Sequence, residues 1–111
     1  MIRLRDEILE YPYTGVITRV VEGTDTDEVV EIYNGVMDET MVTDNEGRSL
    51  QTSSYIVSIP LTKDDQGKYI IPLKGDEIAL ERYGQTVEYT VNNAEPSQLS
   101  GVSIHVTRKE W

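Results

Sequence analysis

Few residues of this chain are of the types that carry catalysis. Its 111 residues include one histidine and no cysteine, so a thiolate nucleophile and a thiolate metal site are both excluded. His105 alternates with Ser103 and Thr107 on the polar side of a strand-like pattern, and no nearby carboxylate is placed to orient it for acid–base chemistry. The chain also lacks a Gly-x-Ser-x-Gly nucleophile motif and a glycine-rich phosphate loop. We therefore expect no catalytic residue, no cofactor and no enzymatic activity, with His105 at a surface or an interface.

One short spacing resembles a metal site. Asp25-x-Asp27 matches the first two ligands of a calcium loop. Val29 and Val30 follow, however, where such a loop continues with an acid, a glycine and a distant glutamate. We expect no metal to bind there.

The carboxylates are concentrated in one part of the chain. The formal net charge is -10, from 20 acidic and 10 basic residues, and no Lys or Arg occurs between Arg19 and Arg48. A surface that grips nucleic acid needs Lys and Arg to neutralise phosphates, so this segment argues against DNA binding and leaves repulsion of a polyanion open. The acidic segment 22–47 contains Glu22, Asp25, Asp27, Glu28, Glu31, Asp38, Glu39, Asp44 and Glu46.

The size of the chain fits one domain, residues 1–111, with one modest core. No apolar run approaches the ~20 residues that a membrane helix needs, and the start of the chain lacks the apolar region of a signal peptide. We expect an intracellular protein that does not enter a membrane.

Alternation with a period of two dominates the sequence and predicts strands. Residues 16–21 and 29–34 read as two strands joined by the acidic turn 23–27, and residues 101–108 read as a half-buried strand. A pair of short strands, 55–60 and 69–72, flanks the turn cluster 63–68. Helix is expected only as a turn or two in residues 2–10 and one turn near residues 96–99.

Residues 75–91 predict a hairpin whose turn contains Gly84. If Gly84 and Gln85 are the central residues of the turn, Glu81 faces Glu88, and like charges directly opposite one another are destabilising. If Tyr83 and Gly84 are central, Leu80 faces Val87 and the acids separate. Turn chemistry favours the first register and charge favours the second, so both remain open at this point.

Residues 36–53 form a connection too long for a simple turn, and we expect a projecting loop or a hairpin of its own there. The whole pattern predicts an all-β domain, a small barrel or sandwich of six to seven mostly antiparallel strands with this one long projecting loop. Several aromatic, methionine and arginine side chains are candidates for an interface, because such side chains are enriched there, although packing is the alternative for the methionines. These candidates are Tyr11, Tyr13, Met37, Met41, Arg82, Arg108 and Trp111.

The order and spacing of these elements resemble the small head-closure proteins (head-completion or stopper proteins) of tailed bacteriophages. The matching features are the strand Gly15–Thr18, the strand end Glu31–Gly35 before a long loop, and the entry Lys74–Ile78 into a hairpin, with a final strand that ends the chain. The similarity covers most of the chain in the order and spacing of its elements.

The resemblance implies a structural component of a virion neck, assembled in the host cytoplasm. Such a protein forms a sixfold or twelvefold ring between the portal or its adaptor and the tail, and DNA passes through the ring without specific binding. We expect the loop carboxylates Asp38, Glu39, Asp44 and Glu46 to face this channel and repel phosphates. Basic residues outside the acidic segment would then form ion pairs between subunits or rings; they are Arg3, Arg5, Arg19, Arg82, Arg108 and Lys109.

Two other functions fit the composition. A monomeric acidic protein could mimic DNA and occupy nucleic-acid-binding enzymes, although its charges should then cover an extended face. A small β-barrel binding module with an acidic loop is the other alternative.

Overall fold

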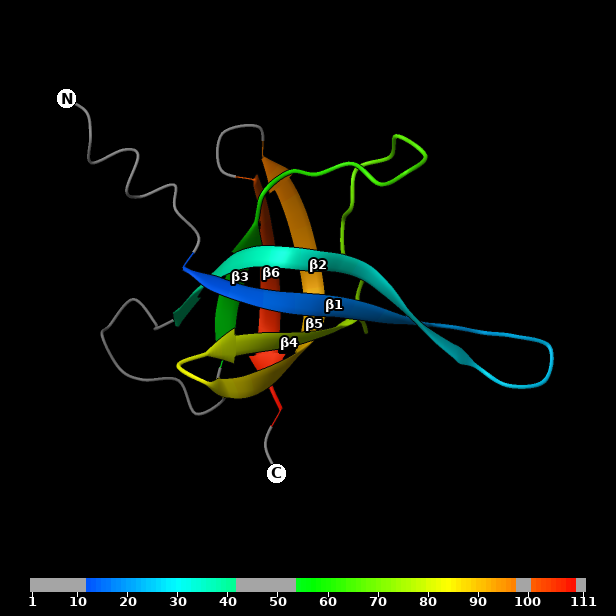
Figure 1. Cartoon of the computed structure of the whole chain (residues 1–111), viewed down its shortest axis with the longest axis horizontal. Helices are drawn as coiled ribbons and strands as arrows, with labels where there is room; N and C mark the ends of the chain where they lie inside the picture. The colour runs from blue at the N-terminus through cyan, green and yellow to red at the C-terminus, as the bar shows by residue number, and fades with distance from the viewer. Residues whose placement is uncertain (1–11, 42–53, 98–100, 110–111) are drawn as a thin grey trace.

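The computed structural model describes residues 12–41, 54–97 and 101–109, and these form an all-β domain without helices (Figure 1). The strands are β1 (Tyr13–Val21), β2 (Glu28–Met41), β3 (Ser54–Ile59), β4 (Glu77–Arg82), β5 (Gln85–Ser97) and β6 (Gly101–Arg108).

The six strands close into a barrel. Their order around it is β1-β2-β3-β6-β5-β4, every neighbouring pair is antiparallel, and pairing of β4 with β1 completes the ring. Each strand is therefore paired on both sides over part of its length. The expected all-β fold with six strands is confirmed, in its barrel form.

The barrel interior is filled by the apolar side of each alternating strand. Val102, Ile104 and Val106 of β6 are 0–1% exposed, and the polar residues between them are half-buried. Tyr89 of β5 is the largest fully buried side chain among the described residues. The core therefore follows the period of two that the sequence shows.

The β4–β5 hairpin settles the register that sequence leaves open. Arg82 pairs with Gln85 and Leu80 with Val87, so Tyr83 and Gly84 are the central residues of the turn. Both have positive φ, 53° and 78°, as a type I′ turn requires. The register keeps Glu81 opposite a threonine rather than opposite Glu88.

Three local predictions are wrong. Residues 36–41 do not begin a loop, because β2 runs on to Met41 and pairs with β3 from Asp38 onward. The expected strand 69–72 is reduced to a single bridge between Lys63 and Tyr69. Pro96 lies in β5 instead of a helical turn.

Other predictions fall outside the described residues, namely the helical turns in residues 2–10 and the rest of the long loop, residues 42–53. Within the described ranges, no helix is long and apolar enough to cross a membrane.

Candidate functional site: a projecting acidic arm

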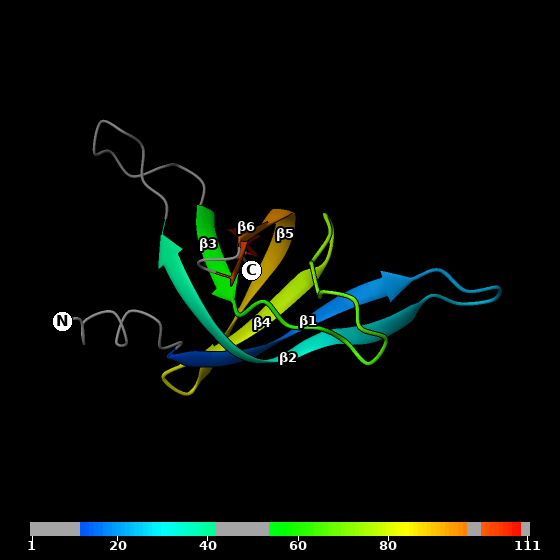
Figure 2. The same cartoon turned by 90° about the horizontal axis from the view of Figure 1, so that it is seen from above.

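The most prominent feature of the molecule is an arm formed by residues 20–31, here called the acidic arm. It is the far end of the β1–β2 hairpin, and it projects well beyond the barrel (Figures 1 and 2). Pairing of β1 with β4 stops at Thr18, and pairing of β2 with β3 begins only at Asp38. The two strands therefore leave the barrel wall as a ribbon that no other described strand flanks.

A β-bulge marks the place where the ribbon leaves the wall. Ile17 pairs with Tyr33, but the next residue, Thr18, pairs with Glu31, so Ile32 is an extra residue on β2. Bulges bend the strand and increase its twist. The bulge thus explains why the arm departs from the curvature of the barrel.

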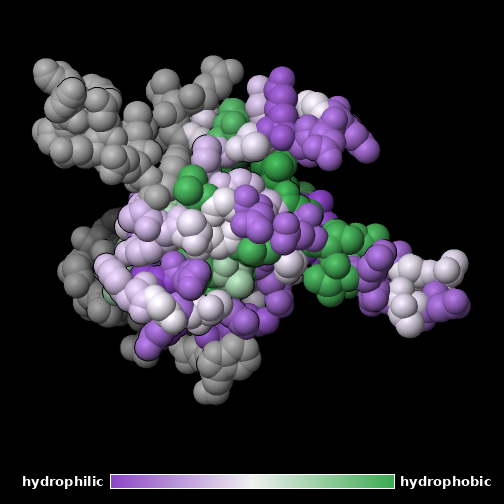
Figure 3. All heavy atoms as spheres, in the orientation of Figure 1, coloured by the Kyte–Doolittle hydropathy of each residue, from purple (hydrophilic) through white to green (hydrophobic). Residues whose placement is uncertain are grey.

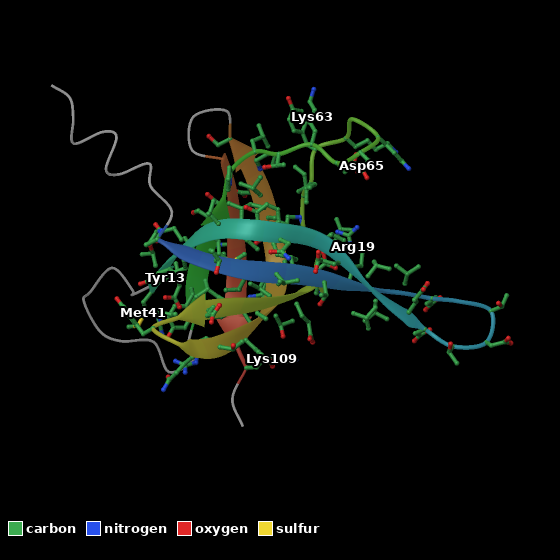
Figure 4. The ribbon with its side chains drawn as sticks, viewed as in Figure 1. Tyr13, Arg19, Met41, Lys63, Asp65 and Lys109 are labelled. Carbon is green, nitrogen blue, oxygen red and sulfur yellow. The ribbon has the colours of Figure 1, made fainter. Side chains whose placement is uncertain are left out.

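The base of the arm is tied to the turn before β4 by a bidentate ion pair. Arg19 donates from Nε to Asp76 Oδ1 at 3.0 Å and from Nη2 to Asp76 Oδ2 at 2.8 Å. Nη2 also lies 3.4 Å from the carbonyl oxygen of Ile71. Asp76 is only 3% exposed and accepts the backbone N–H of Leu73 as well. The hydrogen bonds that Arg19 donates to Asp76 raise the pKa of Arg19, which therefore stays charged. Figure 4 shows Arg19 at the root of the arm.

Five carboxylates cover the arm, and all of them are exposed: Glu22, Asp25, Asp27, Glu28 and Glu31. Within the described residues, none of them forms an ion pair with a Lys or Arg. Like charges held together without counter-charges produce a strong local negative potential. The arm is therefore a concentrated anionic surface on a projecting support.

Valines form the apolar part of the arm. Val20 and Val29 are directly paired across the two strands and are 58% and 65% exposed, and Val21 is 43% exposed. Figure 3 shows apolar side chains gathered where the arm leaves the barrel, with hydrophilic residues toward the tip. Exposed apolar clusters rimmed by polar groups are typical of interaction sites.

A second charged cluster lies inside the barrel wall. The Glu39 carboxylate on β2 accepts hydrogen bonds from Arg82 on β4 and from the Tyr89 hydroxyl on β5. The Glu39 side chain is 5% exposed and that of Arg82 is 27% exposed. Burial raises the pKa of Glu39, and Arg82 opposes this effect. The cluster connects three strands of the barrel.

The four predicted loop carboxylates are not on one loop. Asp38 and Glu39 are strand residues, and Glu39 is bound within the chain, so it is not a free wall charge. Asp44 and Glu46 lie outside the described residues. Within the described residues, the acidic segment that projects is 22–31, which the sequence pattern assigns to a turn and the start of a strand.

Some of the predicted interface residues are exposed, one is buried in the core, and others lie outside the described residues. Met37 is fully buried in the core, so its interface role is wrong, whereas Met41 is 53% exposed. Tyr13 makes an edge-to-face contact with Tyr83, and Arg108 is exposed. Arg19, Arg82 and Lys109 form ion pairs within the chain, so the expectation that they serve contacts between subunits loses its support. Tyr11 and Trp111 lie outside the described residues.

Neither a metal site nor a catalytic arrangement is evident in the described ranges. No cluster of three or more His, Cys, Asp or Glu residues is placed to hold a metal ion there. His105 is half-buried on β6, opposite Ile56 and Asn93 of the neighbouring strands. Two open pockets flank the segment 60–73, and one of them is lined by Leu61, Tyr69, Ile71, Pro96 and Ser97.

No protein-family model matches this chain, and no curated protein or solved structure is significantly similar to it. The resemblance to head-closure proteins therefore stays a prediction. What the structure defines is a closed six-stranded barrel that carries one acidic arm.

Proposed function

We propose that this protein is a structural ring component of a tailed-phage neck, placed between the portal or its adaptor and the tail. In this role the acidic arm faces the channel through which DNA passes. The observation that carries the proposal is the set of five exposed carboxylates on a projecting ribbon, none of which forms an ion pair with a Lys or Arg of the described residues.

The physical reason is repulsion between like charges. In a ring each arm is repeated once per subunit, so the negative potentials of the arms add around a closed circle. Phosphates passing through such a circle would find no cation to bind, and DNA would move without sticking. The arm takes the place of residues 36–53 in this role, because residues 36–41 are part of the barrel wall.

The base of the arm suits a surface that must keep its position. Asp76 is buried and accepts hydrogen bonds from Nε and Nη2 of Arg19, so the first residues of the arm are fixed to the barrel. A ribbon anchored in this way can hold its carboxylates at a constant distance from a channel axis.

The charge distribution favours this role over that of a monomeric DNA mimic. Outside the arm, the described residues contain nine carboxylates and seven Lys or Arg, which is close to balance. A mimic should present charge along an extended face, whereas here five of the seven excess negative charges of the described residues lie on one hairpin.

The proposal is tested by assembly with genetic neighbours. The product of a portal or adaptor gene beside the coding sequence is co-expressed with the full chain, and the complex is analysed by light scattering and electron microscopy. The expected result is a ring of six or twelve copies bound to the portal or adaptor. Neighbouring genes unrelated to virions, or a chain that stays monomeric with all such partners, would contradict the proposal.

A further inference from the structure

The acidic arm has an unpaired strand edge. Strand β2 begins at Glu28, but its pairing with β3 begins only at Asp38, so the outer edge of the arm has no partner strand among the described residues. Figures 1 and 2 show the start of β2 leaving the barrel with β1 as its neighbouring strand on one side only. An unpaired edge presents backbone N–H and C=O groups that pair readily with another extended chain. The geometry therefore suits the addition of a β-strand.

Each face of this edge carries one valine and one glutamate. Strands β1 and β2 pair without interruption from Glu28 to Glu31, so successive residues of β2 point to opposite faces of the ribbon. Val29 and Glu31 therefore share one face, and Glu28 and Val30 share the other. The side chain of Val29 is 65% exposed, both glutamates are exposed, and Val30 is half-buried.

A strand added to this edge would lie beside these four side chains in order. Neighbours on one face of a sheet stabilise the pairing when apolar groups meet apolar groups and when opposite charges meet. The complementary segment therefore has basic residues opposite Glu28 and Glu31. Two adjacent apolar residues between them lie opposite Val29 and Val30. In either chain direction this pattern reads basic-apolar-apolar-basic.

The two glutamates are available to such a segment, because neither forms an ion pair with a Lys or Arg of the described residues. Glu31 lines a pocket of about 370 Å³ together with Arg19 and Lys68 of its own chain. Arg19 is already paired with Asp76. The backbone hydrogen bond from Lys68 lowers the pKa of Asp64, and the positive charge of Lys68 acts in the same direction. Both cations of the pocket thus have another carboxylate beside them.

The sequence points to a different protein as the occupant. No four consecutive residues of this chain read basic-apolar-apolar-basic, so a second copy does not supply the matching segment. A second acidic arm is also a poor occupant, because residues 20–31 contain five acids and no Lys or Arg.

We propose that residues 28–31 of the acidic arm bind an extended basic segment of a partner protein by strand addition. Main-chain hydrogen bonds along the edge of β2 hold the segment, its two cations approach Glu28 and Glu31, and its apolar residues cover the two valines. This contact goes beyond the neck function and does not depend on it, and it leaves the acids of residues 22–27 exposed.

A synthetic peptide tests the proposal on the full chain. The probe is Thr-Lys-Val-Val-Lys-Thr with blocked ends, and calorimetry at low salt measures its binding. The expected result is binding together with slower exchange of the outward-facing backbone amides in residues 28–31. The matched control Thr-Val-Lys-Lys-Val-Thr has the same composition and charge, but it places lysines opposite valines and should bind roughly tenfold more weakly. Equal affinities of the two peptides would contradict the proposed pairing.

Backbone methylation separates strand addition from simple attraction between charges. Successive N–H groups of a β-strand point to opposite edges, so methyl groups on alternate backbone nitrogens of the peptide block one edge only. Of the two peptides methylated on alternate residues, one should bind like the unmodified peptide and the other should not bind. Equal binding of both would mean that charge alone attracts the peptide, and it would overturn the proposal.

Substitutions in the chain give an independent readout. E28Q/E31Q should weaken peptide binding roughly fivefold, in line with the loss of two exposed ion pairs. The matched control E81Q/E95Q removes the same charge from exposed positions elsewhere and should leave binding unchanged. Equal loss of binding in both variants would overturn the inference. Protection of the outward-facing amides of residues 28–31 without peptide would also overturn it, because another part of the chain would then cover the edge.

Discussion

Replacing Asp76 by alanine tests how firmly the acidic arm is held to the barrel. Asp76 is 3% exposed, and its carboxylate accepts hydrogen bonds from Nε and Nη2 of Arg19 and from the Leu73 N–H. Removing one partner of a buried ion pair lowers the free energy of unfolding by roughly 3 to 5 kcal/mol, because the other charge is left buried without a counter-charge. The Arg19 side chain is 30% exposed and can regain water, so we take the lower end, about 3 kcal/mol.

This cost converts into a melting temperature. For a chain of 111 residues the entropy of unfolding is about 0.23 kcal/mol/K near the transition, so D76A should lower Tm by about 13 °C. Differential scanning calorimetry of the full chain measures this value. The arm itself should become more mobile, which shows as faster amide exchange in residues 20–31 than in the natural chain.

The adjacent carboxylate is the matched control. Glu77 pairs with Lys109 at 2.8 Å, but its side chain is 50% exposed, and exposed pairs contribute little to stability. E77Q should leave Tm and the exchange of the arm unchanged. Equal Tm values for D76A and E77Q, or an unchanged arm in D76A, would refute the idea that the Arg19–Asp76 pair anchors the arm.

Three further perturbations address other parts of the fold. Burial raises the pKa of Glu39 above its ordinary value of 4.5, so the folded state binds this proton more tightly than the unfolded state. The stability that this proton contributes is therefore present at low pH and is lost as the pH rises through the pKa of the folded state. Because the E39Q side chain does not titrate, the Tm of this variant should fall less steeply above pH 4.5 than the Tm of the natural chain. Parallel curves of Tm against pH for the two proteins would contradict this prediction. G15A should lower the free energy of unfolding by about 2 kcal/mol, because a Cβ at Gly15 would lie 2.7 Å from the carbonyl oxygen of Ala79 and 2.7 Å from Met37 Sδ. Urea denaturation measures this loss, and T14A at the neighbouring exposed position is the control. The triple variant E22Q/D25N/D27N should keep the Tm of the natural chain. Its assembled rings should repel double-stranded DNA less strongly, which is measured at low salt as a change in the gel mobility of the DNA.

Local pattern was sufficient to predict the regular strands. The alternation of Val102, Ile104 and Val106 gave the bounds of β6, and the acidic turn between β1 and β2 was expected from residues 23–27. Both depend only on neighbours within a few residues, where a period of two has a direct meaning.

The predictions were wrong where contacts with residues distant in sequence determine the local structure. Asp38 and Glu39 look like loop residues, yet Glu39 points into the barrel because Arg82 and Tyr89, 43 and 50 residues away, satisfy its carboxylate. Pro96 is tolerated in β5 because pairing with β4 ends near Thr90, which leaves one edge of β5 open at that point.

The anchoring of the arm could not be read from the sequence for the same reason. Arg19 and Asp76 are 57 residues apart, and only closure of β4 onto β1 brings them together. The sequence also does not show that β4 stops pairing with β1, and β3 with β2, before the end of the β1–β2 hairpin. Where this pairing ends depends on the whole barrel and not on the residues of the hairpin. The sequence shows that acidic residues are concentrated in this segment, but not that a projecting ribbon carries them.

The position of the acidic arms in the assembled particle tests the central claim most directly. Electron cryomicroscopy of the full chain bound to its portal or adaptor should show a closed ring with residues 22–27 of every copy at the inner surface, around the path of DNA. Arms on the outer surface of the ring, away from the channel, would contradict the account.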